Sequence, residues 1–333
     1  EKNHLLVRYS GQFSVENLND TKQLEKNEDI FVQVHEFETG EITCAYEPYL
    51  TMICDGFRRY MTGTFEEFME TCDVYYLHRP VLLGYFNQDN TGREEIILLD
   101  EVAYEQERML AALERMLCAI ADRHPVLFVL NRFQLASKST MQLTARFLKC
   151  ENCNIGLVLG VSDVQAMPEF LVPDWEMLYE TLDDGSKIYH IGNSGRKKEE
   201  TIDDEKYVDY GSEKVYRKLQ NMVEFLDFDQ AAYYLETIER KIKFDNLLVD
   251  DAARFRMWLL FVKVSILRQD IPKALEICED LEKIHLAGKE EECAYEQDYL
   301  IATAYMYQGK LKEALEMAGE TYRIAGKMSD DYR

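Results

Sequence analysis

Short apolar runs alternate with helix-like stretches in the first half of the chain. Residues 109–120 carry apolar side chains at every third or fourth position, which predicts a helix with one buried face. Five other runs predict β-strands, because they are continuously apolar or rich in β-branched and aromatic residues: 4–8, 30–34, 125–130, 155–160 and 187–191. Strands that alternate with such helices are typical of an α/β fold with a mostly parallel sheet. Residues 74–86 and 96–99 are also β-prone, but the pattern gives them no place in that sheet.

The second half is helical in pattern from about residue 212 onward. Three segments share one mark, an apolar residue, two polar or proline residues and then alanine: 228–231, 271–274 and 311–314. We expect each segment to open a helix after a tight turn. The alanines Ala231, Ala274 and Ala314 lie 43 and 40 residues apart. This near-constant spacing predicts helical hairpins that stack as a repeat array and bury one another.

The change of pattern divides the chain into an α/β domain over 1–195 and an all-α helical-repeat domain over 212–333, which continues past or is truncated at its C-terminus. Residues 196–211 are polar and charged, as is typical of a linker. The chain begins with Glu1 rather than methionine and reaches Arg333 without a helix-ending motif. We therefore expect a larger protein with an output domain beyond Arg333.

Composition limits the classes of function. The 333 residues include 62 Asp and Glu but 38 Lys and Arg, which gives a formal net charge of −24. Such a surface repels phosphate backbones and anionic lipids, so we expect no nucleic-acid or membrane partner for this segment. No apolar run is long enough to span a bilayer, and no signal peptide is visible. The 8 cysteines lie mostly within apolar or helical patterns, which indicates reduced thiols in a cytoplasmic protein.

Spacing alone gives little support for metal or catalytic chemistry. Cys150 and Cys153 form a C-x-x-C pair, but zinc needs four ligands and no second close pair exists. Glu151 opposes the electropositive setting that a redox pair requires. We therefore interpret both cysteines as structural thiols. The six histidines are scattered, and we predict neither a metal site nor catalytic residues.

The last helical hairpin resembles a tetratricopeptide repeat. Small and aromatic residues stand where that family brings its two helices together: Ala302, Tyr305, Gly309, Ala314 and Ala318. The preceding hairpin fits more loosely, with Val262, Ser265, Gln269, Ala274 and Cys278. Both spacings exceed the family's period of about 34 residues, so we expect longer helices or turns.

This resemblance implies that the first helix of each pair lines a groove for a protein or peptide. In one hairpin the groove residues are Arg256, Leu259, Lys263 and Ile266. In the next they are Glu296, Tyr299, Thr303, Met306 and Tyr307. The alternative is that these helices only bury the core of the array. An oligomer is compatible with either arrangement.

The first half resembles the nucleotide-binding domain of the signal-transduction ATPases with numerous domains, which are AAA-related modules of bacterial regulators. The match covers 119–137, where a helix leads through Pro125 into an apolar strand, and continues over 139–148 and 154–162. The resemblance implies a P-loop-type, ASCE-like parallel sheet that binds ATP with Mg²⁺ and precedes helical repeats. We expect the opening strand to lie beside the strand that ends at Leu130.

At the positions where this family binds phosphate and hydrolyses ATP, the sequence carries different residues. A working phosphate loop reads G-x-x-x-x-G-K-[ST], in which the lysine reaches the phosphates and the hydroxyl binds Mg²⁺. Phe13, Ser14 and Val15 stand where the glycine, lysine and hydroxyl belong. Asn131 and Arg132 stand where the family has one acid for Mg²⁺ and one that activates water. The vestigial nucleotide site therefore comprises Ser10, Gly11, Gln12, Phe13, Ser14 and Val15, together with Asn131 and Arg132.

We predict a non-catalytic signalling module without a cofactor, in which a pseudo-ATPase domain is coupled to protein-binding repeats in a bacterial regulator. Three alternatives stay open. The first is a genuine ATP switch or slow ATPase that binds ATP or ADP with Mg²⁺ through Ser10, Ser14 and Asn131. The second is the N-terminal part of a transcription regulator or nucleotide cyclase. The third is a different α/β sheet that never bound nucleotide.

Overall fold

The structure is a computed structural model, and it describes residues 4–9, 30–38, 40–88, 101–150, 153–162, 167–183, 187–191, 209–284 and 290–328. Contacts between residues divide the chain into two compact units. The first, the sheet unit, comprises Glu1–Ile96, Ala103–Val208 and Glu224–Asp227. The second, the helical unit, comprises the rest of the chain. Of the predicted linker, residues 196–208 lie outside the described residues.

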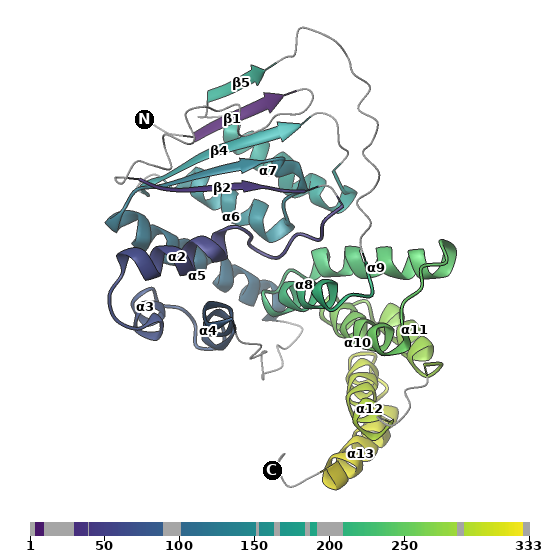
Figure 1. Cartoon of the computed structure of the whole chain (residues 1–333). Coiled ribbons are helices and arrows are strands. Elements are labelled where there is room, and N and C mark those ends of the chain that lie inside the picture. Colours follow the sequence, from purple (N-terminus) through teal and green to yellow (C-terminus); the bar gives the residue numbers. More distant parts are fainter. Residues whose placement is uncertain are drawn as a thin grey trace. The chain divides into compact units, whose positions relative to one another are not determined.

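Five parallel strands form the sheet of the sheet unit (Figure 1). They are β1 (His4–Tyr9), β2 (Phe31–Glu36), β3 (Val126–Asn131), β4 (Ile155–Ser162) and β5 (Lys187–Ile191). All five strands predicted from the sequence are confirmed, to within one or two residues at each end. They lie in the order β2-β3-β4-β1-β5, and every neighbouring pair is parallel, which confirms the α/β fold.

The position of β4 corrects one expectation about this sheet. The opening strand β1 does not lie beside β3, because β4 separates them: Val158 of β4 aligns with Leu5 on one side and with Val129 on the other. A parallel crossover through a single helix usually returns the chain to a neighbouring position. The connection that follows β3 therefore places β4 where β1 was expected.

Helices α2 (Tyr49–Tyr60), α5 (Val102–Arg123) and α6 (Lys138–Lys149) cover one face of the sheet (Figure 1). The ring of Tyr49 lies 4.7 Å from that of Phe128 in β3 and 5.5 Å from that of Phe147 in α6. Its hydroxyl lies 2.5 Å from that of Thr144, and burial raises the pKa of Tyr49. The helix predicted over 109–120 is confirmed as part of α5.

Further helices of the sheet unit are α3 (Phe65–Thr71), α4 (Arg79–Asn87) and α7 (Val172–Asp183), with short 3-10 turns at Phe133–Leu135 and Glu169–Leu171. The β-prone residues 74–86 form no strand, because most of them belong to a turn and to α4. Pro80 lies in the first turn of α4, where no backbone N–H is needed, and Val81 and Leu82 are buried. Helical packing therefore overrides the β-propensity of this segment.

The helices of the helical unit come in pairs joined by short turns. They are α8 (Glu213–Glu224), α9 (Phe228–Phe244), α10 (Asp251–Leu267), α11 (Ile271–Leu281), α12 (Glu290–Tyr307) and α13 (Leu311–Met328). Helices α9, α11 and α13 begin at Phe228, Ile271 and Leu311, which confirms the three helix starts predicted from the repeated mark.

The turns of the second and third pairs have the same geometry. A backbone N–H reaches back five residues in each, from Asp270 to Ser265 O at 2.8 Å and from Lys310 to Tyr305 O at 2.9 Å. The residue before each donor has a positive φ, 62° at Gln269 and 81° at Gly309. This pattern satisfies the last carbonyls of a helix. The equivalence of the two hairpins is therefore confirmed, whereas their membership of the tetratricopeptide family stays a prediction.

Several helices are amphipathic rather than uniformly apolar. Helix α5, for example, has 22 residues and buries Met109, Leu113 and Met116 on one face. Charged residues such as Glu107 and Arg115 interrupt its sequence. Within the described ranges, none of the helices combines the length and the apolar character needed to cross a membrane.

Gly56 provides a test of the packing between α2 and α5. A Cβ built at Gly56 would lie 2.8 Å from Cγ2 of Ile120 and 3.2 Å from Cε1 of Phe31. We expect Gly56→Ala to destabilise the sheet unit by about 1–2 kcal/mol, because overpacking outweighs the gain in helix propensity. Trp175 lies in the sheet unit and Trp258 in the helical unit, so denaturation followed by Trp175 fluorescence in a Trp258→Phe background isolates this effect.

The matched control is Gly319→Ala in α13, whose added Cβ meets no atom within 4 Å. This change should leave stability unchanged or raise it by up to about 1 kcal/mol, as read from Trp258. Equal losses at both positions would contradict close packing at Gly56.

Candidate functional site

Three polar residues meet at the carboxyl edge of the sheet, where β2 and β3 end. The parallel register aligns Glu36 at the end of β2 with Asn131 at the end of β3. Arg132 follows Asn131 directly and turns the chain away from the strand. Ligands of open α/β sheets bind outside the carboxyl ends of the strands. The structure thus brings the predicted residues Asn131 and Arg132 to the edge at which such a site would form.

The contacts of these side chains are made within the protein. Asn131 is 2 % exposed, and its Oδ1 accepts the backbone N–H of Arg132 at 3.0 Å. Arg132 has a φ of 52°, and its Nε lies 3.4 Å from Oε1 of Glu36. A guanidinium is permanently protonated and cannot take a proton from water. The amide and the guanidinium therefore stabilise a turn and an ion pair at the end of β3.

The predicted phosphate loop, Ser10, Gly11, Gln12, Phe13, Ser14 and Val15, lies outside the described residues. Strand β1 ends just before it, and Tyr9 aligns with Ser162 at the end of β4. The chain leaves β1 toward β2 on one side and leaves β4 toward β5 on the other. Such a switch point between neighbouring strands is where α/β sheets form their binding crevice. The topology therefore gives the predicted loop a suitable place, and its chemistry stays a prediction.

A buried carboxylate occupies the N-terminus of α6. Asp227 is 4 % exposed and accepts the backbone N–H of Ser139 at 3.1 Å. Ser137 caps the same helix by accepting the backbone N–H of Thr140 at 3.3 Å. The N-terminus of a helix attracts anions through its unpaired N–H groups and its dipole. Residues 224–227, which belong to the sheet unit, supply that anion from within the chain.

The hydroxyl groups at the start of α6 hold the loop that follows β2. The Ser139 Oγ accepts the backbone N–H of Tyr46 at 3.0 Å. The Thr140 hydroxyl donates to the backbone oxygen of Glu47 at 2.9 Å. The Ser139 and Thr140 hydroxyls therefore form hydrogen bonds with backbone groups of the loop that follows β2.

The predicted groove residues divide into buried and accessible groups. Leu259 and Ile266 are buried, so their side chains pack inside the protein and do not form part of an accessible binding surface. Accessible side chains are those of Arg256, Lys263, Glu296 and Met306, whereas Tyr299, Thr303 and Tyr307 are half-buried. Arg256 pairs with Glu213 of α8 at 2.8 Å. The accessible part of the predicted groove is thus smaller and more polar than the sequence register implied.

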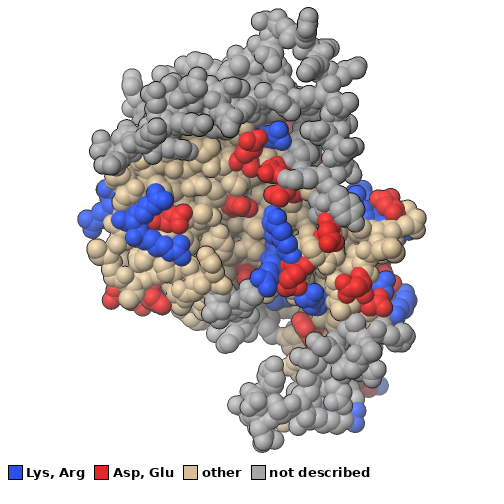
Figure 2. All heavy atoms as spheres, in the orientation of Figure 1, with Lys and Arg blue, Asp and Glu red and all other residues tan. Residues whose placement is uncertain are grey.

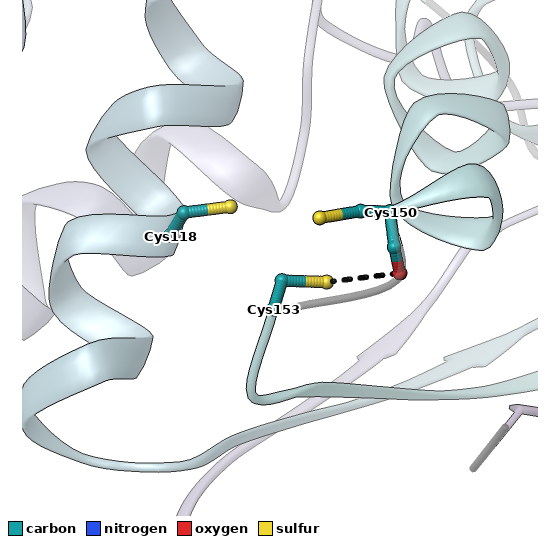
Figure 3. Close-up of side chains that lie close together, drawn as sticks. All are labelled: Cys118, Cys150 and Cys153. Carbon is teal, nitrogen blue, oxygen red and sulfur yellow. Dashed lines mark hydrogen bonds between the residues drawn. The ribbon is translucent and has the colours of Figure 1, made fainter. Parts of the chain in front are cut away.

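Three cysteine thiols converge elsewhere in the sheet unit (Figure 3). Cys118 comes from α5, Cys150 is the C-cap of α6, and Cys153 precedes β4 by two residues. Their Sγ atoms all lie within 4.8 Å of one another, and all three residues are half-buried. The C-x-x-C spacing identifies Cys150 and Cys153 in the sequence, but no local spacing connects them to Cys118, which lies on a separate helix.

The electrostatic setting of these thiols differs from that of the core cysteines. A hydrogen bond with Cys118 lowers the pKa of Cys153 to about 6 and raises that of Cys118. Burial instead raises the pKa of Cys54 to about 12. The Cys153 Sγ also lies 3.7 Å from the backbone oxygen of Cys150 (Figure 3). Cys153 therefore differs chemically from the inert buried thiol that the sequence predicted.

Acidic and basic side chains are interspersed on the face drawn in Figure 2. Several of the described charges form ion pairs, such as Arg146 with Glu114 at 2.7 Å and Lys273 with Glu239 at 2.9 Å. In the described part of this face, acidic and basic side chains therefore lie among one another and do not form one region of a single charge.

The carboxylate at the start of α6 can be tested by substitution. We expect Asp227→Ala to destabilise the sheet unit by about 1–3 kcal/mol, because the buried N–H of Ser139 loses its acceptor. Asp227→Asn keeps an acceptor oxygen and loses only the charge, so its cost should be about 0.3–1 kcal/mol. Denaturation followed by Trp175 in the Trp258→Phe background measures both. Equal costs for the two variants would mean that the hydrogen bond is unimportant.

No family model matches the chain, and no curated protein is significantly similar to it in sequence. The resemblances to regulator ATPases and tetratricopeptide repeats therefore depend on residue patterns. Function must be inferred from the geometry of the sheet edge, the helical hairpins and the three thiols.

Proposed function

We propose that the chain is a non-catalytic, cytoplasmic regulatory module. In this proposal, a pseudo-ATPase domain of the AAA-related type is coupled to tetratricopeptide-like hairpins that bind a protein or peptide. The observation that carries the proposal is the pair formed by Asn131 and Arg132 at the end of β3, where an active relative would hold its acids.

The chemistry of ATP hydrolysis explains why this pair matters. Phosphoryl transfer depends on Mg²⁺ held beside the phosphates and on a group that orients the attacking water. The Asn131 oxygen already accepts a backbone N–H, and Arg132 places a positive charge 3.4 Å from the Glu36 carboxylate. A fixed cation at this edge repels Mg²⁺ and cannot act as a base. Both features favour a domain that keeps the fold without the reaction.

The order of the strands supports an ASCE-like sheet. That class is defined by an additional strand between the strand of the phosphate loop and the strand that carries the acids. Here β4 lies between β1 and β3. The strand that separates β1 from β3 therefore fits the proposed class, but it contradicts the neighbour order on which the sequence-based assignment of the nucleotide site depended.

Equivalent helical hairpins support the second half of the proposal. The turns after α10 and α12 share their hydrogen bonds and their left-handed residue. Stacked hairpins of this kind present helix faces to a partner along the array. Met306 of α12 is 48 % exposed, so it offers an apolar contact on the predicted binding side.

Isothermal titration with ATP and Mg²⁺ tests the pseudo-ATPase. We expect no binding tighter than about 1 mM, because the lysine and both acids of an active site are replaced. Tighter binding, with hydrolysis that is lost in Asn131→Ala, would contradict the proposal and favour a genuine ATP switch.

Restoring the missing groups tests the alignment itself. Phe13→Gly, Ser14→Lys, Val15→Thr and Asn131→Asp together should create measurable binding of ATP that depends on Mg²⁺. The matched control carries the three loop changes but keeps Asn131, and it should show weaker dependence on Mg²⁺. A folded quadruple variant without any gain in binding would show that the loop is placed wrongly.

The proposed binding side of the hairpins can be tested with Met306→Glu. A buried charge at an apolar contact is costly, so this variant should bind its partner at least about tenfold more weakly. Affinity capture from cells that express the full chain, quantified by mass spectrometry, measures the loss. Leu248→Glu is the control, because Leu248 is 94 % exposed but lies outside the predicted groove. An identical set of partners for both variants would argue against this surface.

A further inference from the structure

The three converging thiols point to a function that neither the sheet edge nor the hairpins explain. Cys118, Cys150 and Cys153 come from three separate segments, and their Sγ atoms all lie within 4.8 Å of one another (Figure 3). Two thiols can form a disulfide, but that bond needs the sulfurs at about 2.05 Å and leaves the third thiol unused. A single metal ion can use all three.

The distances suit a metal that prefers sulfur. A zinc–thiolate bond is about 2.3 Å long, so two thiolates on one tetrahedral ion lie about 3.8 Å apart. The separations are at most 4.8 Å, so each needs to close by no more than about 1 Å, which side-chain rotation can supply. The half-buried setting of all three residues leaves them accessible to an ion from solvent.

Two of the three thiols lie beside an ion pair that joins their helices. Glu114 lies one helical turn before Cys118 on α5, and Arg146 lies one turn before Cys150 on α6. These two residues form an ion pair at 2.7 Å, which holds the helices together beside the thiols. Since the Glu114 carboxylate is engaged by Arg146, the donor set that remains is sulfur. Thiolate donors select Zn²⁺ and similar thiophilic ions over Mg²⁺ or Ca²⁺.

We propose that Cys118, Cys150 and Cys153 together bind one thiophilic metal ion, with Zn²⁺ as the physiological occupant. Three protein ligands leave the fourth tetrahedral position for water or an external ligand. The ion joins α5 to Cys150 and Cys153, so binding stabilises the folded sheet unit by an amount that rises with the logarithm of the free metal concentration. This site is independent of nucleotide binding and adds metal sensing to the proposed regulatory role.

Titration of the full chain with Cd²⁺, after reduction and removal of metals, tests the site. Cadmium reports thiolate ligands directly through a charge-transfer absorption. We expect one Cd²⁺ per chain in this cluster and competition by Zn²⁺. Loss of a group outside the ligand set typically weakens metal binding about 10–100-fold, so Cys118→Ser should weaken it by more than about 100-fold.

The matched control is Cys44→Ser, because Cys44 is also a half-buried cysteine outside any disulfide but does not belong to the cluster. This variant should bind Cd²⁺ as the wild type does. Absence of the absorption in the wild type, or an undiminished signal in Cys118→Ser, would falsify the proposal.

A second measurement needs no variant. Zn²⁺ should protect Cys118, Cys150 and Cys153 of the wild-type chain from alkylation by iodoacetamide, as mapped by mass spectrometry, whereas Cys44 should react equally with and without the metal. Unchanged alkylation of the three thiols would overturn the proposal.

Discussion

Parallel pairing of neighbouring strands decides where the polar groups of the sheet unit can act. In a parallel sheet all carboxyl ends meet at one edge and all amino ends at the other. The register between β2 and β3 therefore brings Glu36 level with Asn131 and places Arg132 beside both. At the opposite edge, the backbone N–H of Val126 donates to the oxygen of Asn154, so the residues before β4, including Cys153, lie near the start of β3. The two sites thus occupy opposite edges of one sheet.

At the carboxyl edge, groups of the protein itself neutralise the polar features that could have held a ligand. The Asn131 oxygen accepts a backbone N–H, Arg132 pairs with Glu36, and Asp227 supplies an anion to the N-terminus of α6. The contacts of the buried Asn131 and Asp227 satisfy groups that would be costly to leave unpaired in a protein interior, whereas the pair of Arg132 and Glu36 is partly exposed. These contacts are consistent with the proposed pseudo-ATPase domain.

The amino edge has a different character, because three thiols converge there. Their convergence depends on the packing of α5 against α6, which the ion pair between Glu114 and Arg146 stabilises. A metal at this position would reinforce contacts that the fold already makes. Metal concentration could therefore act on the stability of the sheet unit without any change at the carboxyl edge.

The sequence by itself determined the local elements of this protein. Apolar and β-branched runs predicted all five strands, periodicity predicted the buried face of α5, and the repeated mark predicted the starts of α9, α11 and α13. Each of these signals depends on residues within a short window. Only the tertiary structure decided that β4 separates β1 from β3, that residues 79–87 are helical and that Cys118 joins Cys150 and Cys153. These outcomes depend on contacts between residues far apart in the chain, for which one sequence carries no periodic signal. The same reason explains why Leu259 and Ile266, assigned to a groove by their helical register, are buried instead. Register gives the face of a helix, whereas its neighbours decide whether that face is covered.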